Sequence, residues 1–167
     1  MGLKITGCCV VAGIATGEVL VTSQPISFWG GVDPATGLIN DPRHDLFGQS
    51  VAGKVLVFPF GKGSSTGSLI MLELVRVDKA PAAIVNVRTE PILATGPIVS
   101  NHFYGRQIPI ISLAENSFRM LKTGQRATVN ATEKFIDLHS LYSRKKIKDS
   151  VSENDLKRAI YSEIFII

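Results

Sequence analysis

The chain has 167 residues, of which 45% are hydrophobic, 19% charged and 7% aromatic, and its formal net charge is +4. This composition excludes global disorder and a collagen-like repeat, and the length favours a single domain with one substantial core. No apolar run approaches the roughly 20 residues that cross a bilayer, so we expect no membrane span.

The first 50 residues predict short strands separated by turns. Apolar and β-branched residues at 8–11 and 18–22 indicate two strands joined by a glycine-containing turn. Residues 33–37 read Asp-Pro-Ala-Thr-Gly, in which proline presets one dihedral and glycine allows positive φ, so this segment is a turn. Leu38-Ile39 can pair back as a small hairpin, and the polar, proline-broken stretch 40–48 is a loop.

The middle of the chain alternates between strand and helix patterns. Buried strands are expected at 54–58, 82–87 and 108–111, each followed by a helix, at 69–77, 90–100 and 114–122. Two further strands, 126–130 and 134–138, close the domain as a hairpin. This order predicts an α/β fold with a mixed sheet.

The pattern changes after residue 139, so we divide the chain into a domain, 1–139, and a tail, 140–167. The tail contains a basic linker and an amphipathic helix from Glu153 to Ile167, with Ser152 as N-cap. The basic run Arg144–Lys148 has no interleaved aromatic residues, so it favours a solvated linker over a nucleic-acid site.

The two cysteines, Cys8 and Cys9, are adjacent. They cannot form an ordinary structural disulfide, and two thiols are too few for a zinc or iron–sulfur site, so we expect no metal on this chain. We predict two small buried residues in a strand, in a reduced, cytoplasmic compartment. Asp41, His44 and Asp45 are metal-ligating types, but their loose spacing favours a surface loop.

The loop Gly61–Ser68 is the most informative segment. It connects a buried strand to a helix, where free backbone N–H groups and the positive helix end suit an anion, and its glycines allow close approach. It is neither a Walker A loop nor a dinucleotide fingerprint. It predicts a carboxylate or phosphate site, with a plain turn capped by serine as the alternative. Arg88 and Glu90 either line the same face or form a solvated pair, and Trp29 is a core residue or a pocket wall.

Five segments carry a resemblance to a known family: 25–33, 41–48, 51–59, 61–68 and 80–86. Over roughly residues 1–138 the chain resembles the swivel domain, or small subunit, of the aconitase X family. The resemblance implies a swivelling β/α domain with a mixed, partly barrel-like sheet. It also implies a hydro-lyase, a heterodimer in which a larger partner subunit carries an iron–sulfur cluster on its cysteines and this chain alone is inactive.

The same resemblance assigns roles within the loop. Ser64 is the catalytic base, while Gly63, Ser65 and Thr66 hold substrate oxygens and Lys62 is a candidate cation that stabilises the alkoxide. The substrate is a small carboxylate or phosphate compound. Two non-catalytic readings stay open, an anion-binding module that uses the same loop and a nucleic-acid-binding protein.

Two activities of the family fit, dehydration of cis-3-hydroxy-L-proline and dehydration of mevalonate 5-phosphate. The order Ser64-Ser65-Thr66 in the loop and the segment Phe28–Gly31 look nearer to the hydroxyproline branch, which is our first prediction. A free-standing small chain is how the phosphomevalonate enzyme is built, and that activity is the alternative.

Overall fold

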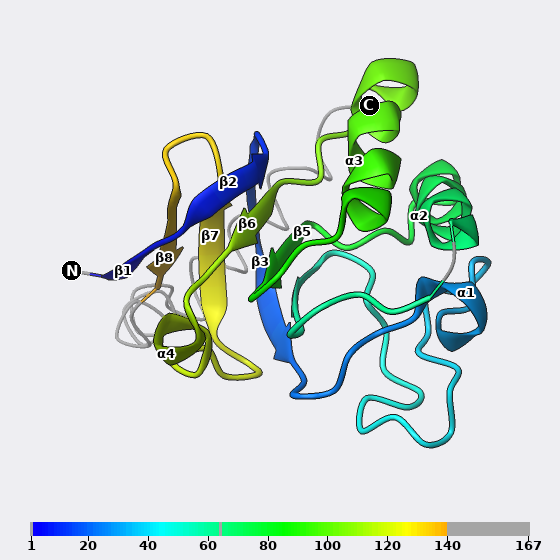
Figure 1. Ribbon diagram of the computed structural model, residues 1–167, viewed down its shortest axis with the longest axis horizontal. Coiled ribbons are helices and arrows are strands. Elements are labelled where there is room, and N and C mark those ends of the chain that lie inside the picture. The colour runs from blue at the N-terminus through cyan, green and yellow to red at the C-terminus, as the bar shows by residue number, and fades with distance from the viewer. Residues whose placement is uncertain (1, 64, 140–167) are drawn as a thin grey trace, which may run out of the picture.

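The computed structural model describes residues 2–63 and 65–139 (Figure 1). Ser64 and the tail, including the predicted helix from Glu153, lie outside the described residues. In chain order the strands are β1 (Leu3–Thr6), β2 (Cys8–Val11), β3 (Ile14–Val21), β4 (Lys54–Val57), β5 (Ala83–Asn86), β6 (Ile110–Ser112), β7 (Arg126–Asn130) and β8 (Phe135–Leu138), and the helices are α1 (Phe28–Gly31), α2 (Thr66–Arg76), α3 (Pro91–Tyr104) and α4 (Glu115–Phe118).

The strands form one mixed sheet in the order β1-β8-β7-β3-β4-β5-β6-β2. Neighbours from β3 to β6 are parallel and the other pairs are antiparallel. The two outer strands, β1 and β2, are separated in the chain by Gly7 alone, so the sheet curls until one bent segment lines both of its edges. Gly7 fits this bend because a β-carbon there would lie 2.6 Å from the Ser112 carbonyl oxygen.

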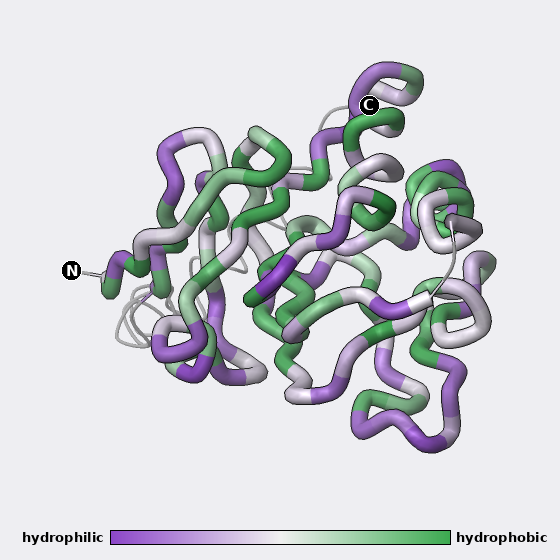
Figure 2. Tube along the Cα trace, in the orientation of Figure 1, coloured by the Kyte–Doolittle hydropathy of each residue, from purple (hydrophilic) through white to green (hydrophobic). Residues whose placement is uncertain are grey.

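Alternation along the strands divides the core in two. On β4, Val55 and Val57 face the inside of the curl, while Leu56 and the following Phe58 face the helices. The first cluster packs between the sheet and helices α2 and α3, and the second is enclosed by the strands and by Phe118 of α4. Figure 2 shows the apolar stretches following the central strands.

Helices α2 and α3 lie side by side on the outer face of the sheet (Figure 1). Their approach is close at Gly96, where a β-carbon would lie 2.8 Å from Cβ of Met71. This contact places α2, and with it the loop that enters its N-terminus. No helix in the described part of the chain is long and apolar enough to cross a bilayer.

Most predicted elements are confirmed, including the 33–37 turn, the three central strands and the hairpin of β7 and β8. Strand β1 was not predicted, and the helix expected over 114–122 is only the four-residue α4. Helix α3 extends past residue 100 and ends at Gly105, in the left-handed conformation. Cys8 and Cys9 lie in a strand as predicted but are exposed, because β2 is an edge strand.

Candidate functional site

The loops that follow β3, β4 and β5 meet at the carboxyl edge of the parallel strands, where α/β sheets commonly bind ligands. The Gly61–Ser68 segment begins in the loop after β4 and runs into α2. One side of this loop is tied to the segment after β3, because the Lys62 amide donates to the Ile26 carbonyl at 2.9 Å. The other side is tied to the end of β5, where the Val87 amide donates to the Pro59 carbonyl at 3.0 Å.

A buried asparagine adds a side-chain hydrogen bond between the ends of β4 and β5. Asn86 is fully buried, its Nδ2 donates to the Phe58 carbonyl at 2.8 Å, and its Oδ1 accepts from Thr89 Oγ1 at 3.3 Å. Asn86 is not among the predicted site residues. The available signal was one amide side chain inside the apolar run 82–87.

The structure brings four of the predicted site residues, Lys62, Gly63, Ser65 and Thr66, into one turn at the start of α2. The fifth, Ser64, lies between them and outside the described residues. Gly63 has φ +115, and a β-carbon there would lie 2.9 Å from Ser27 Oγ. Position 63 therefore requires glycine both for its backbone conformation and for its contact with Ser27.

The entry into α2 shows whether Ser65 acts as the capping serine. Ser65 is the N-cap residue, but its dihedrals are helical and its side chain makes no capping hydrogen bond. The Ser68 hydroxyl instead donates to the Ser65 carbonyl at 2.7 Å. Ser65 therefore does not supply the cap of a serine-capped turn, and a helix N-terminus at this loop suits an anion.

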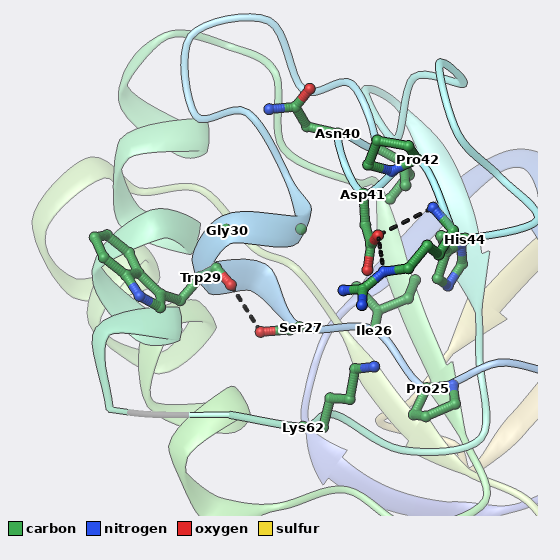
Figure 3. A pocket seen from close by; sticks show the side chains of 13 residues that line it. Pro25, Ile26, Ser27, Trp29, Gly30, Asn40, Asp41, Pro42, His44 and Lys62 are labelled. Carbon is green, nitrogen blue, oxygen red and sulfur yellow. Dashed lines mark hydrogen bonds and ion pairs between the residues drawn. The ribbon is translucent and has the colours of Figure 1, made fainter.

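A hollow of about 440 Å³ opens beside this loop (Figure 3). Its wall is formed mainly by segments 27–31 and 40–44, which overlap two of the segments that carried the family resemblance, and by Lys62. Trp29 stands at this hollow and is 58% exposed, so it is a pocket wall and not a core residue.

The charges of the hollow come mainly from Asp41, Arg43 and Lys62. The backbone N–H of Arg43 and then its guanidinium hold the pKa of the Asp41 carboxyl below its ordinary value, and the Lys62 charge adds to this effect. Asp41 is therefore ionised near neutral pH and paired with Arg43 at 3.2 Å. Lys62 is exposed and makes no ion pair with any residue that the structure describes.

Asp41, His44 and Asp45 do not form a metal centre. The Asp45 carboxylate accepts the Thr22 hydroxyl at 2.7 Å, and His44 Nδ1 accepts the Leu46 amide at 3.1 Å. In residues 2–63 and 65–139 no three His, Cys, Asp or Glu side chains converge as metal ligands. The loop thus holds these groups in local hydrogen bonds, although His44 is buried and not at the surface.

Arg88 and Glu90 form the predicted solvated pair, and only Glu90 is shown lining the same face as the loop. Their side chains form a pair at 3.8 Å. Glu90 also borders a small space against Gly61 and Gly63. The Arg88 guanidinium lies 5.2 Å from the Phe60 ring centre, over a second groove of about 490 Å³.

Comparison with known proteins gives concordant matches. The profile of the aconitase X swivel domain matches residues 4–138. The phosphomevalonate dehydratase small subunit of Methanosarcina mazei is 45% identical over 137 residues, which cover 81% of this chain and 91% of that protein. That of Thermococcus gammatolerans is 46% identical over 131 residues, covering 78% and 94%. The crystal structure of Thermococcus kodakaraensis aconitase X in its holo-form superposes with a TM-score of 0.75 at 43% identity, covering 83% of this chain and all of that one.

Proposed function

The chain belongs to the aconitase X swivel-domain family, and on that premise we propose that it is the small subunit of a dehydratase acting on mevalonate 5-phosphate. The observation that carries the proposal is the Gly61–Ser68 loop, which is held at the carboxyl edge of the sheet and enters α2 without a cap from Ser65. This choice departs from the sequence-based preference for cis-3-hydroxy-L-proline, because the relatives compared above are phosphomevalonate dehydratase small subunits.

The charge beside the loop supports a substrate with two anionic ends. Mevalonate 5-phosphate carries a carboxylate and a phosphate, whereas hydroxyproline carries a carboxylate and a cationic amine. Lys62 projects into the hollow without an ion pair among the described residues, and Arg43 balances Asp41. An extra positive charge attracts a phosphate and repels an ammonium group.

In the proposed step Ser64 takes the proton from the carbon next to the substrate carboxylate. The electrons of that C–H bond form the new double bond, and the hydroxyl on the neighbouring carbon leaves as water with a proton from the partner's side of the site. A serine hydroxyl is a weak base, so its alkoxide needs positive charge close by. Lys62, two residues earlier, and the N-terminus of α2 supply it on this chain. Gly63, Ser65 and Thr66 hold substrate oxygens through backbone N–H groups and hydroxyls.

The iron–sulfur cluster that the family implies does not fit this chain. Cys8 and Cys9 are consecutive residues of β2, so their side chains point to opposite faces, and no three metal-ligating side chains converge in the described residues. We assign the cluster, which acts as a Lewis acid in such enzymes, to the partner large subunit. This chain then supplies the base and part of the substrate-binding surface, and it is inactive alone.

The test is turnover by the chain reconstituted anaerobically with its cluster-bearing large subunit. Mevalonate 5-phosphate and cis-3-hydroxy-L-proline are offered separately to the wild type, to Ser64→Ala and to the control Ser117→Ala on α4. We expect turnover of mevalonate 5-phosphate, a fall in kcat of about 10²–10⁴-fold in Ser64→Ala and little change in the control.

Turnover of hydroxyproline alone would contradict the substrate and keep the base. Turnover that persists in Ser64→Ala would contradict the base. An assembled complex that holds its cluster, binds these anions and turns over neither would favour the non-catalytic anion-binding module.

A further inference from the structure

One residue in the wall of the hollow beside Lys62 has a buried polar atom that makes no hydrogen bond to any described residue. His44 is 8% exposed, and its Nε2 makes no hydrogen bond to any described residue. His44 lines the hollow, and Figure 3 shows the Lys62 side chain extending toward the space between Asp41 and His44. The residue that carries this atom and Lys62 therefore line the same hollow.

The hydrogen bond at the other ring nitrogen fixes what Nε2 can do. The Leu46 amide donates to Nδ1 at 3.1 Å, so Nδ1 carries no proton in the neutral ring and Nε2 carries it. The Asp45 carboxylate is also 3.2 Å from Nδ1, and it accepts a hydrogen bond from the Thr22 hydroxyl. The donor to Nδ1 is the Leu46 amide. Nε2–H is thus a donor in need of an acceptor, and buried donors in proteins are nearly always paired.

The surroundings select an anionic acceptor. Lys62 adds one positive charge, while Arg43 and Asp41 offset each other. Nε2 itself is shielded from solvent, so a ligand reaches it only after a side chain of the wall moves.

We propose that this hollow is a subsite for a phosphate group, with His44 Nε2–H and Lys62 Nζ as its two donors. The proposal rests on the proposed function in one respect, that the phosphate belongs to the substrate whose reacting carbons lie at Ser64. Lys62 is two residues from Ser64, so the subsite adjoins the loop that carries the base. It binds the phosphate end, away from the carbons that react.

Two substitutions at position 44 separate the effect of losing the Nε2–H donor from the effect of losing the acceptor for the Leu46 amide. His44→Asn keeps an oxygen that accepts the Leu46 amide, as in an Asx turn, and removes the Nε2–H donor. His44→Gln keeps a donor near the position of Nε2 and loses the acceptor for Leu46. Lys62→Gln removes the cation, and Lys54→Gln removes the same charge at the start of β4, at the opposite edge of the sheet. Thermal unfolding of each complex shows whether the variant is folded.

The readouts are KM and kcat of the reconstituted complex for mevalonate 5-phosphate, and the affinity of the same complex for inorganic phosphate by calorimetry. We expect His44→Asn to raise KM and to weaken phosphate binding by about 10-fold or more, with kcat within about 3-fold. We expect Lys62→Gln to weaken phosphate binding by about 10-fold or more and also to lower kcat, because Lys62 stabilises the Ser64 alkoxide as well. His44→Gln is expected to stay within about 3-fold of the wild type in both, as is Lys54→Gln.

The outcomes distinguish this subsite from the proposed function. If the wild-type complex is active, and His44→Asn and Lys62→Gln leave both KM and phosphate affinity unchanged, the subsite is overturned. Weak binding in His44→Gln with normal binding in His44→Asn would reduce His44 to a support for Leu46 and would also overturn it. Phosphate affinity that depends on both residues, in a complex that leaves mevalonate 5-phosphate unchanged, would retain the subsite and contradict the proposed function.

Discussion

Gly63 lies against the side chain of Ser27, so that a β-carbon at position 63 would come within 2.9 Å of Ser27 Oγ. Ser27 in turn is held by a hydrogen bond from its hydroxyl to the Trp29 carbonyl at 2.8 Å. The residue before Ser64 is therefore seated on the segment that leads into α1. This contact links the wall of the hollow to the loop that carries the proposed base.

We predict that Gly63→Ala impairs activity more than stability. The substitution adds a strained backbone at φ +115, which costs about 1–3 kcal/mol, and it pushes the loop away from Ser27. A displacement of about 1 Å at a reacting group lowers the rate by about 10²-fold. Kinetics of the reconstituted dehydratase and chemical denaturation measure the two effects.

Gly105→Ala is the matched control, because Gly105 also has positive φ and a β-carbon there would meet nothing within 4 Å. It should lower stability by about 1 kcal/mol and leave kcat unchanged. Equal loss of kcat in the two variants would show that the Ser27 contact does not position the loop.

Asn86→Ala should destabilise the fold by about 1–3 kcal/mol, because the buried Phe58 carbonyl and Thr89 hydroxyl both lose a partner. Asn86→Asp should be worse, since it sets a carboxylate against the Phe58 carbonyl. Urea unfolding measures both, with Asn116→Ala on the exposed side of α4 as the control. An Asn86→Ala variant as stable as the control would mean that backbone bonds alone hold the ends of β4 and β5.

Gly96→Ala should separate α2 from α3. The added methyl would approach Met71 Cβ to 2.8 Å and the Ser68 carbonyl to 3.1 Å, so α2 must shift and its N-terminal loop with it. We expect a loss of about 1–3 kcal/mol from overpacking and a lower kcat. Thr95→Ala, one residue away and exposed, adds helix propensity without this clash and should be neutral. A neutral Gly96→Ala would show that the two helices can part without cost.

Local patterns were enough for the central strands, the closing hairpin and the site loop, because their signals lie within a few residues. The curl of the sheet was visible only through the family resemblance, since the pairing of β1 with β8 joins positions 3 and 138. Exposure of Cys8 and Cys9 likewise follows from the edge position of β2, which no local pattern encodes.

The relatives compared above favour the alternative substrate, mevalonate 5-phosphate, over the first prediction, which rested on the order Ser64-Ser65-Thr66 and on the segment Phe28–Gly31. The orphaned donor of His44 was also out of reach, because it depends on burial and on the bond between Nδ1 and Leu46.

Residues 140–167 should be dispensable for folding of the domain. The family profile ends at residue 138, and the last described strand, β8, is paired on both sides, with β1 and β7. A chain ending after His139 should therefore keep its unfolding midpoint and its assembly with the large subunit. A matched chain ending after Asn130, which removes β8, should not fold. If the chain that ends after His139 folds but does not assemble with the large subunit, the tail belongs to the partner interface.

The Asp41 carboxyl should titrate below its ordinary pKa, and Arg43→Gln should raise that pKa without restoring it fully. The variant loses the guanidinium bond and charge but keeps the backbone N–H at position 43, which is the largest cause of the shift. Because the pKa is lower in the folded chain, this interaction stabilises the fold above about pH 4 and is lost as the pH falls through the folded value. Carboxyl ¹³C NMR measures the titration, with Arg76→Gln as a control that should raise the pKa of Glu73 alone. An Asp41 signal that titrates at its ordinary value in the wild type would contradict the hydrogen bonds from the Arg43 backbone N–H and guanidinium to this carboxylate.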